Sequence, residues 1–187
     1  MSKLKQYVLS LRSFRVWHRY TGIILLVIVL ISSITGILLA WKKDFDVLQP
    51  PTQKGVSKDL STWKPLHELA ETAQLALVEA HPEQSENPID RMDARPKKGI
   101  VKVLFKKGYW EVQLDGTSGE VKSIAKRHAD WIEHLHDGSI ISDFFKLLSM
   151  NTLGFGLILL LGSGFWLWYG PKRIRKLKQQ KAKSNAR

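Results

Sequence analysis

The sequence predicts an α+β membrane protein in which two transmembrane helices enclose a small domain of one helix on a three- or four-stranded antiparallel sheet. Three observations predict this fold class. Two long runs, residues 20–41 and 147–170, contain no charged side chain. Short segments between residues 89 and 124 alternate apolar and polar side chains, as half-buried strands do. Basic residues gather at the two ends of the chain.

The charge distribution predicts the orientation in the membrane. All 17 acidic residues lie between Asp44 and Asp143, whereas residues 1–19 hold five basic side chains and residues 172–187 hold eight, both without an acid. Basic segments beside apolar runs stay in the cytoplasm. We therefore expect both termini inside and residues 42–146 on the far side. Nucleic acid is not expected as a partner, because the basic excess is not on the folded domain.

The first transmembrane helix is predicted over residues 20–41, after a basic cytoplasmic N-terminus at 1–19. Its 22 uncharged residues suffice to cross the hydrocarbon core, and Trp17, Tyr20 and Trp41 flank it as interfacial aromatics do. A cleaved signal peptide is the alternative. The apolar run is too long for one, and Leu39-Ala40-Trp41 is a poor cleavage site.

The second transmembrane helix is predicted over residues 147–170. Gly170-Pro171 is expected to break it before a basic cytoplasmic tail at 171–187. Cysteine is absent, which excludes disulfides, thiolate metal sites and covalently attached haem.

Small residues recur along both predicted spans and indicate helix packing within lipid. They are Ser32, Gly36 and Ala40 in the first span, and Gly156 and Gly164 in the second. The two spans of one chain could pack through these residues. Alternatively, the first spans of two copies could form a homodimer, with Gly36 nearest the partner helix.

The intervening domain begins with a predicted helix that Ser61 or Thr62 caps, with Pro65 in its first turn. Its apolar face comprises Leu66, Leu69, Ala73, Leu77 and Ala80. Strands are predicted near residues 89–94, 100–106, 109–114 and 120–124. In the central strands, the inward residues are Val101, Val103, Phe105, Trp110, Val112 and Leu114.

Several of these segments resemble a known family. The run Tyr109-Trp110-Glu111-Val112-Gln113-Leu114-Asp115, continuing into Gly119-Glu120-Val121, resembles the strands of the PepSY domain. Trp17-His18-Arg19-Tyr20-Thr21-Gly22 and Leu135-His136-Asp137-Gly138 resemble elements of PepSY-associated transmembrane proteins. The resemblance covers most of residues 14–173. It implies a multi-pass protein of the bacterial inner membrane with a PepSY-like periplasmic domain at 42–146.

The resemblance also implies function. The family is linked with iron-regulated proteins, its larger members with haem-dependent reduction of ferric siderophores, and PepSY domains elsewhere with restraint of peptidases. With two spans, this chain is expected to be an accessory binding or scaffolding module in iron or siderophore utilisation that contacts a transporter, reductase or peptidase. The alternatives are an oligomeric haem-b ferric reductase and a regulator of a membrane or periplasmic peptidase.

Two histidines are the candidate haem ligands. A b-type haem is held through axial side chains such as imidazoles, which must lie at matched depth to share one iron. His18 lies at the cytoplasmic end of the first span and His136 at the opposite face, and a 22-residue helix rises about 33 Å. One chain therefore cannot bring both to one haem. His18 could pair with His18 of a second copy, and His136 with another far-side histidine; otherwise both are interfacial residues.

No catalytic residue and no metal site are predicted. His134 and His136 are two residues apart and point to different faces of a helix. Together with His128 they are better explained as part of a solvated polar helix.

Overall fold

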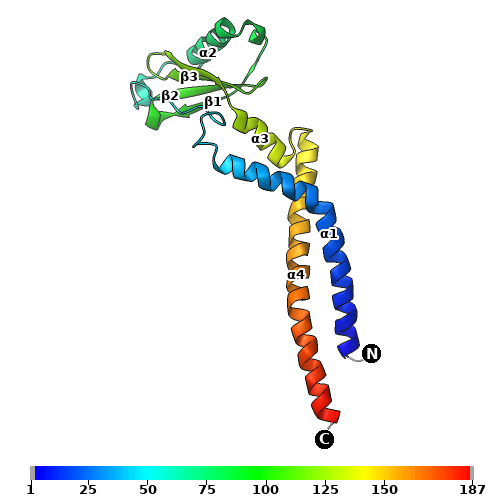
Figure 1. Ribbon diagram of the computed structural model, residues 1–187. Coiled ribbons are helices and arrows are strands. Elements are labelled where there is room, and N and C mark those ends of the chain that lie inside the picture. Colours follow the sequence, from blue (N-terminus) through cyan, green and yellow to red (C-terminus); the bar gives the residue numbers. More distant parts are fainter. Residues whose placement is uncertain (1–2, 186–187) are drawn as a thin grey trace. The chain divides into compact units, whose positions relative to one another are not determined.

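The computed structural model describes residues 3–185 (Figure 1). It divides into two compact units: the membrane unit, which joins residues up to 34 with those from 135, and the sheet unit, residues 35–134. Two helices are long and apolar enough to cross a membrane, and the sheet is four-stranded and antiparallel. These features confirm the predicted α+β membrane fold class.

The two long helices are α1 (Lys3–Ala40) and α4 (Asp143–Asn185). Each continues beyond its predicted span into the basic flank. The expected break at Pro171 is wrong, because α4 runs through this residue. A proline removes one backbone donor, whereas the Lys-, Arg-, Leu- and Gln-rich segment after it favours helix. Side chains such as Ile24 and Leu161 are strongly exposed, as lipid-facing residues are.

Within the membrane unit, α1 and α4 pack along a seam with a seven-residue repeat. Leu11 lies against Gly170, and Leu25 lies against Gly156. Between these contacts, His18 Nδ1 is 2.8 Å from Ser163 Oγ. The contacting numbers rise by seven in α1 and fall by seven in α4, so the helices are antiparallel. A seven-residue repeat is the geometry of left-handed packing between helices.

The seam ends where α3 (His128–Asp137) meets α4. Ser32 Oγ donates to the His136 carbonyl oxygen (3.3 Å), and Ser149 Oγ donates to the Asp137 carbonyl oxygen (3.1 Å). Ser32 and Ser149 continue the same two series of seven. These hydroxyl groups satisfy carbonyls at the end of α3 that have no partner within a helix.

The Asp137 carboxylate closes the turn between α3 and α4. It accepts hydrogen bonds from Lys146 Nζ (2.6 Å) and from the Ser139 backbone N–H (2.9 Å). Burial alone would raise the pKa of Asp137, but these two donors outweigh it and lower the pKa to about 2. The folded-state pKa lies below the ordinary 3.8, so this contribution to stability is present above that value and is lost as the pH falls towards 2.

In the sheet unit, α2 (Leu66–Ala80) covers one face of a meander with strand order β1-β2-β3-β4. The strands are β1 (Ile89–Arg95), β2 (Ile100–Phe105), β3 (Trp110–Asp115) and β4 (Val121–Lys126), close to the predicted segments. Leu69, Ala73 and Leu77 pack on the core-facing side chains. As predicted, these are Val101, Val103, Phe105, Trp110, Val112 and Leu114.

The ends of α2 differ from the prediction. Leu66 and Ala80 are exposed, because the helix extends beyond its buried face at both ends. Pro65 is the N-cap residue, and Ser61 and Thr62 lie in a separate 3-10 turn, Leu60–Thr62. That turn leads into Trp63, whose indole lies so close to Gly116 that a Cβ there would be 2.4 Å from its ring.

We predict that Gly156→Leu disrupts the seam. A Cβ at Gly156 would lie 2.4 Å from Leu25 Cδ1, so a larger side chain forces α1 and α4 apart, at a cost of about 1–3 kcal/mol. Thermal unfolding of the detergent-purified chain should show a lowered Tm. Gly162→Leu is the matched control, since a Cβ at Gly162 meets no atom within 4 Å. Equal effects of the two variants would contradict the seam.

Candidate functional site

The second face of the sheet, opposite α2, buries polar and charged side chains. Lys102 of β2 and Glu111 and Gln113 of β3 are each at most 2% exposed. The segment before α2 covers this face: Gln113 Nε2 donates to the Pro51 carbonyl oxygen (3.1 Å), and its Oε1 accepts from the Gln53 backbone N–H (2.9 Å). Buried charge is unfavourable unless it is paired, so this face depends on its internal partners.

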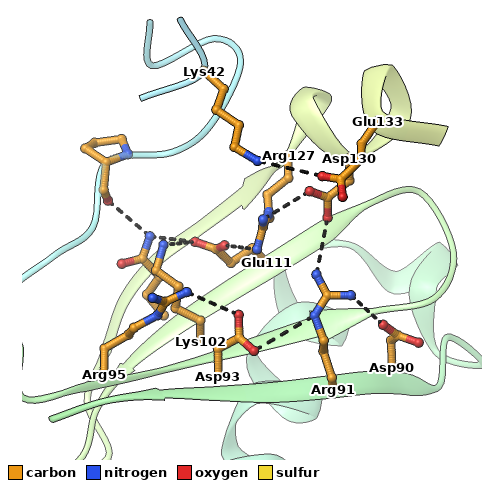
Figure 2. A network of polar contacts seen from close by, with 12 residues as sticks. Lys42, Asp90, Arg91, Asp93, Arg95, Lys102, Glu111, Arg127, Asp130 and Glu133 are labelled. Atoms are coloured by element: carbon orange, nitrogen blue, oxygen red, sulfur yellow. Dashed lines mark hydrogen bonds and ion pairs between the residues drawn. The ribbon is translucent and has the colours of Figure 1, made fainter. Parts of the chain in front are cut away.

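Glu111 is the common partner of the buried donors (Figure 2). Its carboxylate accepts hydrogen bonds from Lys102 Nζ (3.0 Å), Gln113 Nε2 (2.7 Å) and Arg127 Nη1 (3.1 Å). Arg127 is the residue just before α3, so this carboxylate joins β2, β3 and the start of α3. Charge-assisted hydrogen bonds of this kind are about twice as strong as neutral ones.

The ion pairs continue from this centre to the rim of the sheet (Figure 2). Arg127 contacts Asp130 (3.0 Å), Asp130 contacts Arg91 (4.0 Å), Arg91 contacts Asp93 (3.9 Å), and Asp93 contacts Arg95 (3.5 Å). We call this series, with Lys102 and Glu111 at its buried end, the charge ladder. Arg91 and Arg95 are half exposed, and their ion pairs contribute little to stability. The buried pairs at Glu111 determine the geometry.

Asp130 and Asp115 of the sheet unit have pKa values that are shifted in opposite directions. Burial raises the pKa of Asp130 above 3.8, although Arg127 and Arg91 oppose the shift. Burial alone would also raise the pKa of Asp115, but hydrogen bonds from the backbone N–H groups of Ser118, Val56 and Thr117 outweigh burial and lower this pKa. Asp115 Oδ2 thereby holds the covering segment at Val56 (2.6 Å).

Two polar pockets lie along the charge ladder. The basic pocket, about 320 Å³, includes Arg95 and Lys102 in its wall. Its full lining is Lys43, Gln49, Pro50, Pro51, Thr52, Arg95, Lys98 and Lys102. The aromatic pocket, about 340 Å³, includes Arg91 and Asp130. Its full lining is Asp90, Arg91, Leu104, Phe105, Lys106, Tyr109, Trp110, Asp130 and His134.

Tyr109 in the aromatic pocket has a backbone φ of 57°, which makes it the one positive-φ residue other than glycine within the described part of the chain. Its ring lies 5.7 Å from the ring of His134, and its carbonyl oxygen accepts from the Arg127 backbone N–H (2.8 Å). Left-handed backbone at a bulky residue is uncommon and persists where its surroundings fix it. The neighbouring Trp110 packs between His81 (4.1 Å) and Lys126 Nζ (4.8 Å).

The two candidate haem ligands of the membrane unit, His18 of α1 and His136 of α3, lie at different heights along α1. The Ser163 hydroxyl donates to the Leu159 carbonyl oxygen (2.6 Å), so its oxygen can accept a hydrogen bond from His18 Nδ1–H. In that tautomer, the lone pair of the imidazole is on Nε2. The His136 carbonyl oxygen accepts a hydrogen bond from Ser32 Oγ. Ser32 follows His18 by 14 residues in α1, which corresponds to a rise of about 21 Å along the helix axis.

Haem does not fit between these histidines within one chain. Each level supplies one of the two imidazoles. A pocket of about 220 Å³ beside His136 is lined by Val27, Ile31, Phe145 and other residues, mostly apolar. It is smaller than the roughly 300–1,000 Å³ of ordinary ligand sites. A bis-imidazole haem at the level of His18 would therefore need a ligand from a second copy.

The small residues singled out in the sequence have different surroundings. Gly156 contacts Leu25, and Gly164 lies near His18, with a Cβ there 3.5 Å from His18 Cε1. Gly36 is half buried, whereas Ala40, the last residue of α1, is exposed. In the part of the chain that the structure describes, no three His, Asp or Glu side chains gather as a metal site would require.

We predict that Glu111→Gln destabilises the sheet unit by about 3–5 kcal/mol. The substitution keeps the shape of the side chain but leaves Lys102 as a buried cation without a countercharge, and Arg127 with Asp130 as its remaining anionic partner. Chemical denaturation of the full chain, followed by tryptophan fluorescence, measures the loss. Glu120→Gln is the control, because its ion pair with Lys122 is at the surface and should contribute less than about 1 kcal/mol. Comparable losses would refute the central role of Glu111.

Comparison with known families confirms the resemblance noted in the sequence. A search of curated proteins gives no match. A family model described as the PepSY-associated TM region matches residues 15–187, and thus α1 from residue 15 onwards, the sheet and α4. The match covers well over half of the chain, and we conclude that this protein belongs to the PepSY-associated transmembrane family.

Proposed function

We propose that this PepSY-type membrane protein is an accessory binding module in iron or siderophore utilisation, and that its sheet unit holds the ligand or partner. The observation that supports this function is the pair of polar pockets along the charge ladder. Their volumes, about 320 and 340 Å³, fall in the range of small-ligand sites. Charged groups in both walls would orient a polar ligand.

The charge ladder also favours binding because it fixes the pocket walls in advance. Lys102 is held by Glu111, and Asp130 is held by Arg127. Side chains that are already ordered lose little conformational entropy when a ligand arrives. The basic ends of the chain support an orientation with both termini in the cytoplasm and the sheet unit in the periplasm of a bacterial inner membrane.

A haem-b ferric reductase is the second candidate function, and the contact between His18 Nδ1 and Ser163 Oγ is the observation that favours it. With Nδ1–H donating to Ser163, the Nε2 lone pair is the one that would meet an iron. Haem, when bound, would supply one-electron chemistry. Because one chain offers one imidazole at that level, this function requires a homodimer that brings two copies of His18 together through the first span.

The iron role predicts a growth phenotype. Deleting the gene from its bacterial host should slow growth when a ferric siderophore is the sole iron source, and the full chain supplied in trans should restore growth. Iron-replete medium is the control, in which both strains should grow alike. Unchanged growth of the deletion strain under iron limitation would exclude the iron role and leave the binding role to be tested separately.

Visible absorption of the detergent-purified protein separates the two candidate functions. The binding module predicts no Soret band. A Soret band that shifts on reduction with dithionite would instead support the reductase. His18→Ala should then abolish the band if the haem lies between two copies of His18, and His136→Ala should abolish it if the haem lies at the far side. His67→Ala is the matched control, since His67 is exposed on α2, away from the membrane helices. Loss of the band in this variant would exclude both proposed ligands.

A further inference from the structure

The basic pocket of the sheet unit has positive charge that the protein itself does not neutralise. Its lining includes Lys43, Arg95, Lys98 and Lys102 and no acidic residue. Arg95 pairs with Asp93, and Lys102 pairs with Glu111. Neither Lys43 nor Lys98 has an ion-pair partner among the described residues. Two uncompensated cations in one polar hollow favour an anion.

Close backbone contacts fix the wall that carries Lys98. The Gly55 backbone N–H donates to the Lys98 carbonyl oxygen (2.7 Å). A Cβ at Gly55 would lie 1.9 Å from the Gly99 carbonyl oxygen, and Gly99 itself has a φ of 74°. Only glycine accommodates so close an approach and the left-handed turn. The covering segment and the β1–β2 turn are thus held together at the pocket.

A second observation concerns the hydrogen-bonding group that a ligand must offer. Gln49 is one of the residues that line the basic pocket, and its side-chain Oε1 atom is buried without a hydrogen-bond partner. A buried acceptor left unpaired costs free energy that a ligand donor would recover. A fully deprotonated anion offers acceptors only, so the complementary ligand also carries a hydrogen-bond donor, and a hydroxyl group beside the anion would supply it.

We propose that the basic pocket binds a phosphate monoester or diester that carries a neighbouring hydroxyl group. The phosphate oxygens would face Lys43, Lys98 and Arg95, whose guanidinium can donate two parallel hydrogen bonds, and the hydroxyl would donate to Gln49 Oε1. This inference names a ligand class for the binding role proposed above and rests on that role. The inference does not depend on the role in iron utilisation, so an unchanged growth phenotype under iron limitation would not contradict it.

Two sources supply this chemistry: a soluble glycerol phosphate and the headgroup of a glycerophospholipid. Lys43 lies three residues after the end of α1. The rings of Trp41 and Phe45, each 55% exposed and 6.1 Å apart, lie on either side of it in the sequence. Exposed aromatic rings beside a span are typical of the lipid headgroup region. The experiment therefore includes one probe for each source.

The test uses the full chain reconstituted in nanodiscs. The soluble probe is glycerol 3-phosphate, titrated calorimetrically into phosphatidylcholine discs. The lipid probe is phosphatidylglycerol, whose retention over phosphatidylcholine is measured by native mass spectrometry. If glycerol 3-phosphate binds saturably with one-to-one stoichiometry, the ligand is a soluble one. If phosphatidylglycerol in the discs abolishes this binding, or if phosphatidylglycerol is retained selectively over phosphatidylcholine, the ligand is the lipid headgroup. Binding of neither probe would overturn the proposal.

Paired double variants show whether binding occurs at the basic pocket. Lys43→Gln with Lys98→Gln should weaken binding of the active probe about tenfold or more, because two charge-assisted contacts are removed. Lys42→Gln with Lys97→Gln removes the same charge from the adjacent residues, which do not line the pocket, and should change the affinity less than about twofold. All four positions avoid the buried ion pairs. Equal weakening by both doubles would mean non-specific attraction and would refute the site.

Discussion

The buried carboxylate of Glu111 is the constraint on which the sheet unit depends. A charge with no exposure to solvent is tolerated only with partners, and Glu111 has three: Lys102, Gln113 and Arg127. Each partner fixes another part of the unit. Gln113 holds the covering segment at Pro51, Arg127 holds the start of α3, and Lys102 lines the basic pocket. One anion therefore joins the sheet, its cover and the candidate binding site.

The membrane unit is held together differently, because lipid provides no hydrophobic force that drives two apolar helices together. Close approach replaces that force. Gly156 and Gly170 admit the side chains of Leu25 and Leu11, and Ser163 between them bonds to His18. The bulky side chains on the other faces remain available to lipid. The same seam positions the His18 ring against Ser163 and so connects helix packing to the proposed haem chemistry.

The two candidate functions use different parts of the molecule and make different demands on assembly. Ligand binding in the sheet unit needs one chain, since the walls of both pockets come from the charge ladder and its neighbours. Electron transfer through haem needs two chains, since each level of the membrane unit provides one imidazole. The family assignment is compatible with either. The phosphate-binding pocket that we infer would place an anionic group beside the residues that follow α1.

The sequence alone determined the two spans, the strands and the α2-facing core, because these follow from local periodicity: uncharged runs, alternation along strands and helical spacing at Leu69, Ala73 and Leu77. It also determined the family, through motifs near Trp110 and His136. Only the tertiary structure revealed that the second sheet face is buried. Lys102, Glu111 and Gln113 look like solvent-facing residues in an alternating strand, and their burial depends on a segment that contacts Gln113 from 60 and 62 residues earlier in the chain. The continuation of α4 through Pro171 was missed because the proline was given more weight than the helix-favouring residues that follow it. The seam was missed for another reason: Gly156, Ser163 and Gly170 recur every seven residues in the sequence, but only the structure shows which side chains of α1 lie against them.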